Sequence, residues 1–289
     1  MTETTSAQSA AFPWDGAAIA DLMEVAATVA TETCEIITAG RAHATIAGTK
    51  SAAVDIVTQM DLAAEAHVAS RLATLRPGDG MLGEEGARAA GTSGVTWIVD
   101  PIDGTVNYLY GLPHFAVSIA AVMGPPIPGQ WTALAGAIVD GSGNVWQAGK
   151  GRGAWRNEER LWRDGGTPLA GTLLGTGFQY VAERRAIQGQ IVAELLPQVR
   201  DMRRLGSCSV DLCLVAAGDI DAYYEHGLKP WDYAAGALLC TEAGVRVGDA
   251  DGGEPTPDLL IAAMEETWGP LRDAIVAAGG RRPWDTPEL

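Results

Sequence analysis

Apolar residues recur along the chain at two spacings, and the change between them separates the predicted elements. From residue 15 to about residue 37 they return every three or four positions, which predicts an amphipathic helix. Residues 61–75 repeat this spacing, and the Arg-Pro-Gly-Asp-Gly run at 76–80 predicts the end of the second helix. The Gly- and Ala-rich stretch between the two helices predicts a loop that reaches Lys50.

Strand patterns follow the second helix. A short apolar run at 97–99 predicts a buried strand, and alternation over 114–122 predicts another. The proline-rich segment 124–129 is expected to be a loop, because proline cannot donate to a strand ladder. Segments 131–139 and 144–148 predict a hairpin around an Asp-Gly-Ser-Gly turn.

Helical and strand patterns alternate in the remainder of the chain, after a turn-rich stretch at 149–171. We therefore expect an N-terminal α+β subdomain over residues 1–158 and a C-terminal α/β subdomain over residues 159–289. The expected C-terminal strands are 172–176, 201–204, 222–225 and 259–263, and the expected helices are 183–196, 207–217, 231–243 and 267–278.

Composition narrows the class of protein. The chain has 36 acidic and 20 basic side chains and a formal charge of −16. Binding to duplex nucleic acid relies on basic side chains that contact phosphates, so this charge argues against that class of protein. No uncharged apolar run reaches the roughly 18 residues of a membrane span, and the first residues lack the basic part of a signal peptide. The four cysteines form no C-x-x-C pair, so buried free thiols are expected. These features predict a cytoplasmic protein with no membrane or nucleic-acid partner.

The clearest chemical signal is the segment Trp-Ile-Val-Asp-Pro-Ile-Asp-Gly-Thr-Val-Asn at 97–107. A buried strand is expected to deliver Asp100 at its end, where the next residue, a proline, would stop it. Asp103 follows, and the N–H groups of Gly104 and Thr105 are expected to open a helix. Paired carboxylates attract Mg²⁺ and a helix N-terminus attracts phosphate. An isolated D-x-x-D is explained more simply as helix capping.

Two further acidic segments favour a metal site over helix capping as the explanation of Asp100 and Asp103. Glu84 and Glu85 lie between glycines after an apolar residue, and Asp232 stands at the start of a predicted helix. Taken singly, the first pair is explained as a solvated turn and Asp232 as a charge favoured by the helix dipole. Together with the 97–107 segment they could form a cage of carboxylates for Mg²⁺ ions that bridge a phosphate and activate water.

The order of these motifs resembles that of the inositol monophosphatase family, the Mg²⁺-dependent, lithium-sensitive phosphatases. Its first motif is matched by D-P-I-D-G-T at 100–105 and its second by W-D-Y-A-A-G at 231–236. The G-E-E of residues 83–85 and the segment 50–61 fit the upstream elements, and residues 206–225 fit the C-terminal half. The resemblance runs from about residue 15 to residue 278.

The resemblance implies a set of metal ligands for two or three Mg²⁺ ions. Glu85, Asp100 and the backbone carbonyl of Ile102 would bind one ion. Asp100, Asp103 and Asp232 would bind a second, and Glu85 would also contact a third, weaker ion. Glu85 is therefore expected to be catalytic as well as metal-binding.

The resemblance also implies how water and phosphate are handled. Thr105 paired with Asp61 would help to activate the attacking water, without a covalent phosphoenzyme. The N–H groups of Gly104 and Thr105 would hold the phosphate. Glu225 would bind inositol hydroxyls, and Ser207 and Cys208 would line the same pocket.

The family fold is a layered αβαβα sandwich of the inositol monophosphatase and fructose-1,6-bisphosphatase type, usually a homodimer. The implied function is hydrolysis of a small phosphomonoester, myo-inositol 1-phosphate. Histidinol-phosphate phosphatase, fructose-1,6-bisphosphatase and 3′-phosphoadenosine 5′-phosphate phosphatase are the enzymatic alternatives on this scaffold. A different class is a non-catalytic partner in an RNA-polymerase-associated complex, although the charge of −16 argues against direct RNA contact.

Overall fold

A twisted eight-stranded sheet forms the larger half of the molecule in this computed structural model, which describes residues 14–50 and 55–283. The strand order is β10-β9-β8-β7-β6-β5-β3-β4, and only β3 and β5 run parallel. The strands are β3 (Gly80–Gly83), β4 (Arg88–Ala89), β5 (Val95–Asp103), β6 (Ala116–Met123), β7 (Thr132–Asp140), β8 (Val145–Gly149), β9 (Gly153–Arg156) and β10 (Glu159–Leu161).

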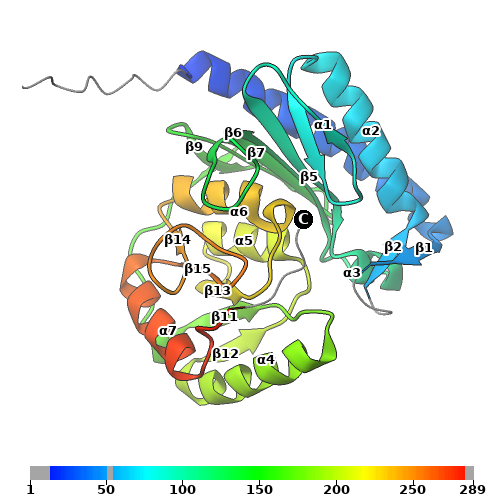
Figure 1. The fold of residues 1–289 in the computed structure, drawn as a ribbon. Coiled ribbons are helices and arrows are strands. Elements are labelled where there is room, and N and C mark those ends of the chain that lie inside the picture. The colour runs from blue at the N-terminus through cyan, green and yellow to red at the C-terminus, as the bar shows by residue number, and fades with distance from the viewer. Residues whose placement is uncertain (1–13, 51–54, 284–289) are drawn as a thin grey trace, which may run out of the picture.

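Two long helices, α1 (Gly16–Gly40) and α2 (Gln59–Leu75), cover one face of this sheet (Figure 1). The Asp15 side chain accepts from the N–H of Ala18 and caps α1. A capping box between Thr58 and Asp61 starts α2 two residues earlier than the apolar pattern indicates. Leu22, Val29 and other apolar side chains of these helices form one buried core with the sheet.

The opposite face of the sheet packs on α5 (Cys208–Ala217) and α6 (Pro230–Glu242). Behind these helices lies a five-stranded sheet of order β12-β11-β13-β15-β14, which α4 (Ala182–Leu195) and α7 (Glu265–Ala277) cover from outside (Figure 1). Its strands are β11 (Leu173–Thr176), β12 (Asp201–Arg203), β13 (Ala222–Glu225), β14 (Arg246–Gly248) and β15 (Leu260–Ala263). The five layers confirm the predicted αβαβα sandwich.

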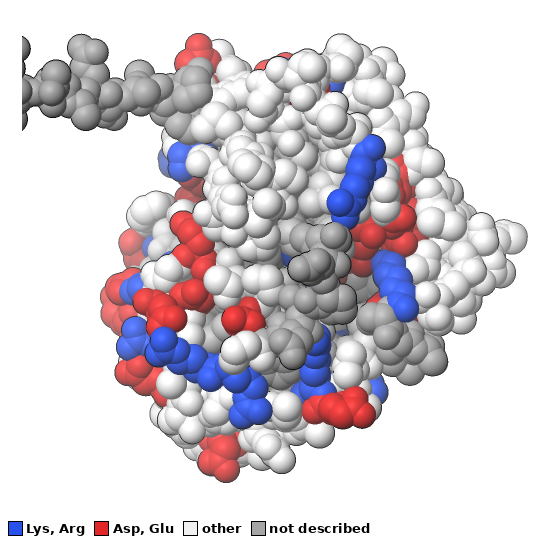
Figure 2. All heavy atoms as spheres, in the orientation of Figure 1, with Lys and Arg blue, Asp and Glu red and all other residues white. Residues whose placement is uncertain are grey.

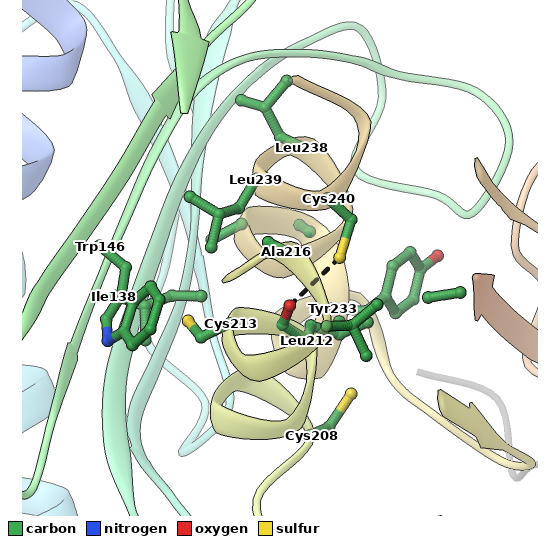
Figure 3. Packing of buried hydrophobic residues seen from close by; sticks show 14 of the residues in the cluster. Ile138, Trp146, Cys208, Leu212, Cys213, Ala216, Tyr233, Leu238, Leu239 and Cys240 are labelled. Atoms are coloured by element: carbon green, nitrogen blue, oxygen red, sulfur yellow. Dashed lines mark hydrogen bonds between the residues drawn. The ribbon is translucent and has the colours of Figure 1, made fainter. Parts of the chain in front are cut away.

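Burial on both faces explains why the central strands of the smaller sheet read as unbroken apolar runs. In β15, Leu260 and Ala262 face the core around α5 and α6, whereas Ile261 and Ala263 face the core under α4 and α7. Figure 3 shows the first of these cores, with Cys213 near Trp146 and with the Cys240 thiol donating to the carbonyl of Leu212.

The cysteines match the expectation from the sequence. Cys34, Cys208, Cys213 and Cys240 are all buried and free in the structure.

Among the described residues, no helix is long and apolar enough to cross a membrane. On the face drawn in Figure 2, acidic and basic side chains both occur.

Two local features differ from the sequence expectations. The loop expected before Lys50 contains β1 (Ile46–Thr49), which pairs with β2 (Ile56–Thr58), and β1 is exposed along its length. The expectation that Pro101 stops its strand is wrong, because β5 continues to Asp103. The register moves from Asp100 opposite Ser118 to Asp103 opposite Ala116, so one extra residue forms a bulge that accommodates the proline.

The expected subdomain division at residues 158 and 159 falls inside a hairpin. β9 and β10 pair Arg156 with Glu159, so the larger sheet extends to Leu161. The chain then reaches β11 of the smaller sheet through the turn-rich segment that the sequence singled out.

Candidate active site

A cleft of about 340 Å³ lies where β5 and α3 (Thr105–Tyr110) meet elements of the C-terminal half. The C-terminal half contributes the segment after β11, the start of α5, the end of β13 and the start of α6. Most of the predicted site residues line this cleft: Asp100, Ile102, Asp103, Gly104, Thr105, Ser207, Cys208, Glu225 and Asp232.

The bulge in β5 positions the first two carboxylates. Asp100 is buried, and its Oδ1 accepts from the N–H of Ile102 at 3.0 Å, which fixes the carboxylate against the turn. Gly104 has a φ of 88° and a Cβ there would lie 2.8 Å from the carbonyl of His114, so glycine is required where α3 begins. Asp103 is thereby turned towards α5.

Asp103 and Asp232 are held by the C-terminal half. The Asp103 Oδ2 accepts from the Ser207 hydroxyl at 2.7 Å and from the N–H of Ser209 at 2.6 Å. Asp232 accepts from the N–H of Lys229 at 2.7 Å, at the first turn of α6. Ser207, expected to line the substrate pocket, therefore also fixes a carboxylate and caps α5.

Glu84 and Glu85 occupy different places. Glu84 lines the cleft together with Asp100, whereas Glu85 is not among the described residues that line it. The Lys50 ammonium reaches Oε1 of both side chains at 2.7 Å, and Glu65 holds the loop by accepting from the N–H of Glu85 at 2.8 Å. The structure places Glu84, rather than Glu85, at the carboxylate cluster.

Crowding of carboxylates is the main electrostatic feature of the cleft. Burial raises the pKa values of the Asp100 and Asp232 carboxyls well above their usual range. The charges of Glu84 and Asp103 raise both pKa values further. Burial also raises the pKa of Glu84 and of Asp103, with Lys50 and Ser207 acting in the opposite direction. A nearby cation would offset this repulsion.

Oxygen donors of this kind suit a hard divalent cation such as Mg²⁺. Besides the carboxylates, the carbonyl of Ile102 lines the same cleft and lies 3.0 Å from Oγ1 of Thr105. Within the described residues, no three acidic, histidine or cysteine side chains are gathered closely enough to hold an ion as they stand. The donor chemistry therefore fits a cation, and binding would require the carboxylates to turn from their protein partners.

Thr105 and Asp61 meet as predicted. The Thr105 Oγ1 lies 3.1 Å from Oδ1 of Asp61, and both side chains are buried. Asp61 also accepts from the backbone N–H of Thr58 at 2.8 Å, so it is fixed at the start of α2. The contact is confirmed, whereas its role in activating water stays a prediction.

Glu225, at the end of β13, lines the same cleft. This carboxyl is 9% exposed, and the Tyr223 hydroxyl donates to its Oε2. Burial raises the pKa of Glu225 to about 7, with the Tyr223 hydrogen bond and Arg204 acting in the opposite direction. Cys208 lies close by and burial raises the pKa of its thiol, so it is expected to act as an uncharged wall.

Sequence reasoning missed several residues that line the cleft. Phe178, Gln179 and Tyr180 follow β11, and Arg204 stacks on Phe178 with its guanidinium carbon 5.9 Å from the ring centre. Asp211 lies on α5. The signal available for the first group was the Gly-Thr-Gly sequence before Phe178, because glycines near a strand end allow close approach of other groups.

Comparisons with known proteins agree with this geometry. A sequence model described as the inositol monophosphatase family matches residues 18–279. The inositol-1-monophosphatase SuhB of Mycobacterium tuberculosis is 48% identical over 208 residues, which cover 68% of this chain and 70% of that protein. The Nus factor SuhB of Escherichia coli is 41% identical over 201 residues, or 69% of this chain and 73% of that one.

Solved structures show the same relationship. The structure of Mycobacterium tuberculosis SuhB has a TM-score of 0.76 at 41% identity and covers 91% of this chain and 98% of that one. The Thermotoga maritima IMPase has a TM-score of 0.80 at 25% identity and covers 90% and 98% of the two chains. The chain therefore belongs to the inositol monophosphatase family, whose members are phosphoric monoester hydrolases.

Proposed function

We propose that this protein is a Mg²⁺-dependent phosphomonoesterase that hydrolyses myo-inositol 1-phosphate. The observation that supports this substrate is Glu225, a carboxyl that lines the same cleft of about 340 Å³ as Asp100. A carboxylate accepts hydrogen bonds from ring hydroxyls. The relatives named inositol-1-monophosphatase support the same substrate.

Five groups would hold the cations: the carboxylates of Glu84, Asp100, Asp103 and Asp232 and the carbonyl of Ile102. Glu84 takes the place that the sequence resemblance gave to Glu85, because Glu84 is the side chain next to Asp100. Bound Mg²⁺ would supply a water of lowered pKa and would offset the charge of the phosphate.

The protein's own groups bind and orient the reactants. The N–H groups of Gly104 and Thr105, at the start of α3, are placed to hold phosphate oxygens. The Thr105 hydroxyl would accept a hydrogen bond from the attacking water while it donates to Asp61, which fixes the direction of its lone pairs. The hydrolysis proceeds by direct attack of water, with no covalent intermediate on the protein.

Two other functions have some support. Glu225 could also pair with a cationic amino-alcohol, which favours histidinol phosphate as an alternative substrate. The E. coli relative named Nus factor SuhB favours a role as a protein partner independent of turnover. Fructose-1,6-bisphosphatase activity has no residue that favours it specifically. Lithium sensitivity, a homodimer and a cytoplasmic location stay predictions from the family resemblance.

Phosphate release from a panel of phosphomonoesters with Mg²⁺ tests the proposal. We expect myo-inositol 1-phosphate to be hydrolysed with a higher kcat/KM than histidinol phosphate or fructose 1,6-bisphosphate. Asp100→Asn should abolish most turnover, whereas Asp273→Asn, at an exposed position of α7, should not. Full turnover by Asp100→Asn would show that the metal mechanism is wrong. Faster hydrolysis of histidinol phosphate would overturn the substrate, and no turnover of any ester would favour the partner role.

A further inference from the structure

Asp211 lines the cleft, but the proposed mechanism gives its carboxyl no role. It lies on α5, lines the same cleft as Glu225 and is 1% exposed. Neither of its oxygens has a hydrogen-bond partner in the part of the chain that the structure describes. Buried polar groups are nearly always paired, and an unpaired one costs about 1–3 kcal/mol, so an orphan of this kind needs an explanation.

The backbone of β11 leaves space for this carboxyl and for Glu225. A Cβ at Gly175 would lie 3.2 Å from Oδ1 of Asp211 and 2.9 Å from the Tyr223 ring. A Cβ at Gly177 would lie 2.1–2.2 Å from the carboxyl atoms of Glu225. Glycine at these two positions, in and just after β11, therefore lets both carboxyl side chains lie close against the backbone.

The charges around Asp211 favour a neutral carboxyl. The charges of Glu225 on β13 and Asp103 on β5 act on it, and Arg204 is the opposing cation. Burial raises the pKa of Asp211 well above its usual range, and the two carboxylates raise it further. A protonated carboxyl has an O–H donor and a carbonyl acceptor, which together match an alcohol hydroxyl that both donates and accepts.

We propose that Asp211 is a substrate-binding residue, which hydrogen-bonds beside Glu225 to hydroxyl groups of a polyol alcohol moiety in the cleft. This inference rests on the proposed phosphatase function. It explains why a buried carboxyl that lines the cleft has no hydrogen-bond partner among the described residues. The substrate class it selects is a phosphorylated polyol rather than a simple aryl or alkyl phosphate.

The test compares two substitutions on two substrates. Asp211→Leu removes the hydrogen-bonding groups and keeps a similar volume, whereas Asp211→Asn keeps one donor and one acceptor. The measured quantity is kcat/KM for myo-inositol 1-phosphate divided by kcat/KM for p-nitrophenyl phosphate, which has no hydroxyl on its alcohol moiety. This ratio does not depend on the fraction of enzyme that is folded or metal-loaded.

We expect Asp211→Leu to lower the ratio about tenfold, mainly through KM for the inositol ester, because one hydrogen bond of this strength is lost. Asp211→Asn should keep the ratio within about threefold of the wild type. An unchanged ratio in Asp211→Leu would mean that the carboxyl only packs the wall, and an equal loss with both variants would also overturn the hydrogen-bonding role. If the wild type itself does not hydrolyse myo-inositol 1-phosphate, that result overturns the proposed function on which this inference rests.

Discussion

Replacement of Glu225 by glutamine is expected to stabilise the metal-free protein, and only at higher pH. Burial raises the pKa of this carboxyl from 4.5 to about 7. The difference corresponds to about 3 kcal/mol, at about 1.4 kcal/mol for each pH unit. Because the folded-state pKa is the higher one, the contribution to stability is fully present below pH 4.5 and is lost as the pH rises through 7.

Glutamine removes that loss and keeps the local hydrogen bond. Its carbonyl can still accept from the Tyr223 hydroxyl, so the substitution tests the charge rather than the contact. The stability difference between Glu225→Gln and the wild type should grow by about 2 kcal/mol between pH 5.5 and pH 8.5. In a chain of this size that corresponds to an increase of about 4 °C in the Tm difference.

Denaturant and thermal unfolding with a chelator present, at several pH values between these limits, would measure the effect. Glu194→Gln, at an exposed position of α4, is the matched control and should show no such pH dependence. A difference for Glu225→Gln that stays constant with pH would refute the reasoning, because it would mean that Glu225 has the same proton affinity in the folded and unfolded chain.

Two further predictions concern the catalytic side of the cleft. Glu84→Gln should lower kcat/KM about tenfold more than Glu85→Gln and should raise the Mg²⁺ concentration required, because only Glu84 of the two lines the cleft with Asp100. Equal effects in a Mg²⁺ titration would contradict this assignment. Thr105→Val should lower kcat by about 100-fold or more with little change in KM, and Thr105→Ser should recover much of the rate, since serine retains the hydroxyl that contacts Asp61. A similar rate for the valine and serine variants would exclude the hydroxyl from the reaction.

The sequence was informative wherever a residue's place depends on its immediate neighbours. Asp100 and Asp103 lie on one short segment, whose apolar strand and glycine fix their direction locally. Asp61 could be paired with Thr105 through the family motif alone, and the structure confirms that contact. The buried strands of the sandwich were recognisable because both of their faces are covered.

The choice between Glu84 and Glu85 was beyond the sequence pattern. Glu84 and Glu85 are identical neighbours, so the sequence pattern does not distinguish them. Which of them faces the cleft depends on the register of β3 against β5. The exposed strand β1 was missed for a related reason. All four of its residues are exposed, so they carry no alternation of apolar and polar positions.

The wall formed by Arg204 and residues 178–180 was missed because it is assembled across the fold. Arg204 follows β12 and Phe178 follows β11, and these two strands pair directly in parallel, which brings the two side chains together. Neither segment resembles a binding motif by itself. Such a wall can be found only when the sheet order is known.

Crowding of carboxylates in the cleft leads to a prediction about Mg²⁺ itself. The raised pKa values of Asp100 and Asp232 mean that protons compete more strongly with a cation for these groups as the pH falls. A ligand that binds only the folded chain stabilises it by RT ln(1 + [L]/Kd), so the rise in Tm caused by a fixed Mg²⁺ concentration should be larger at pH 8.5 than at pH 5.5. Asp232→Asn should reduce this rise, whereas Asp273→Asn should leave it intact. A Mg²⁺ effect that is independent of pH, or is equally large in Asp232→Asn, would place the cation away from this cluster, whatever the outcome of the activity measurements.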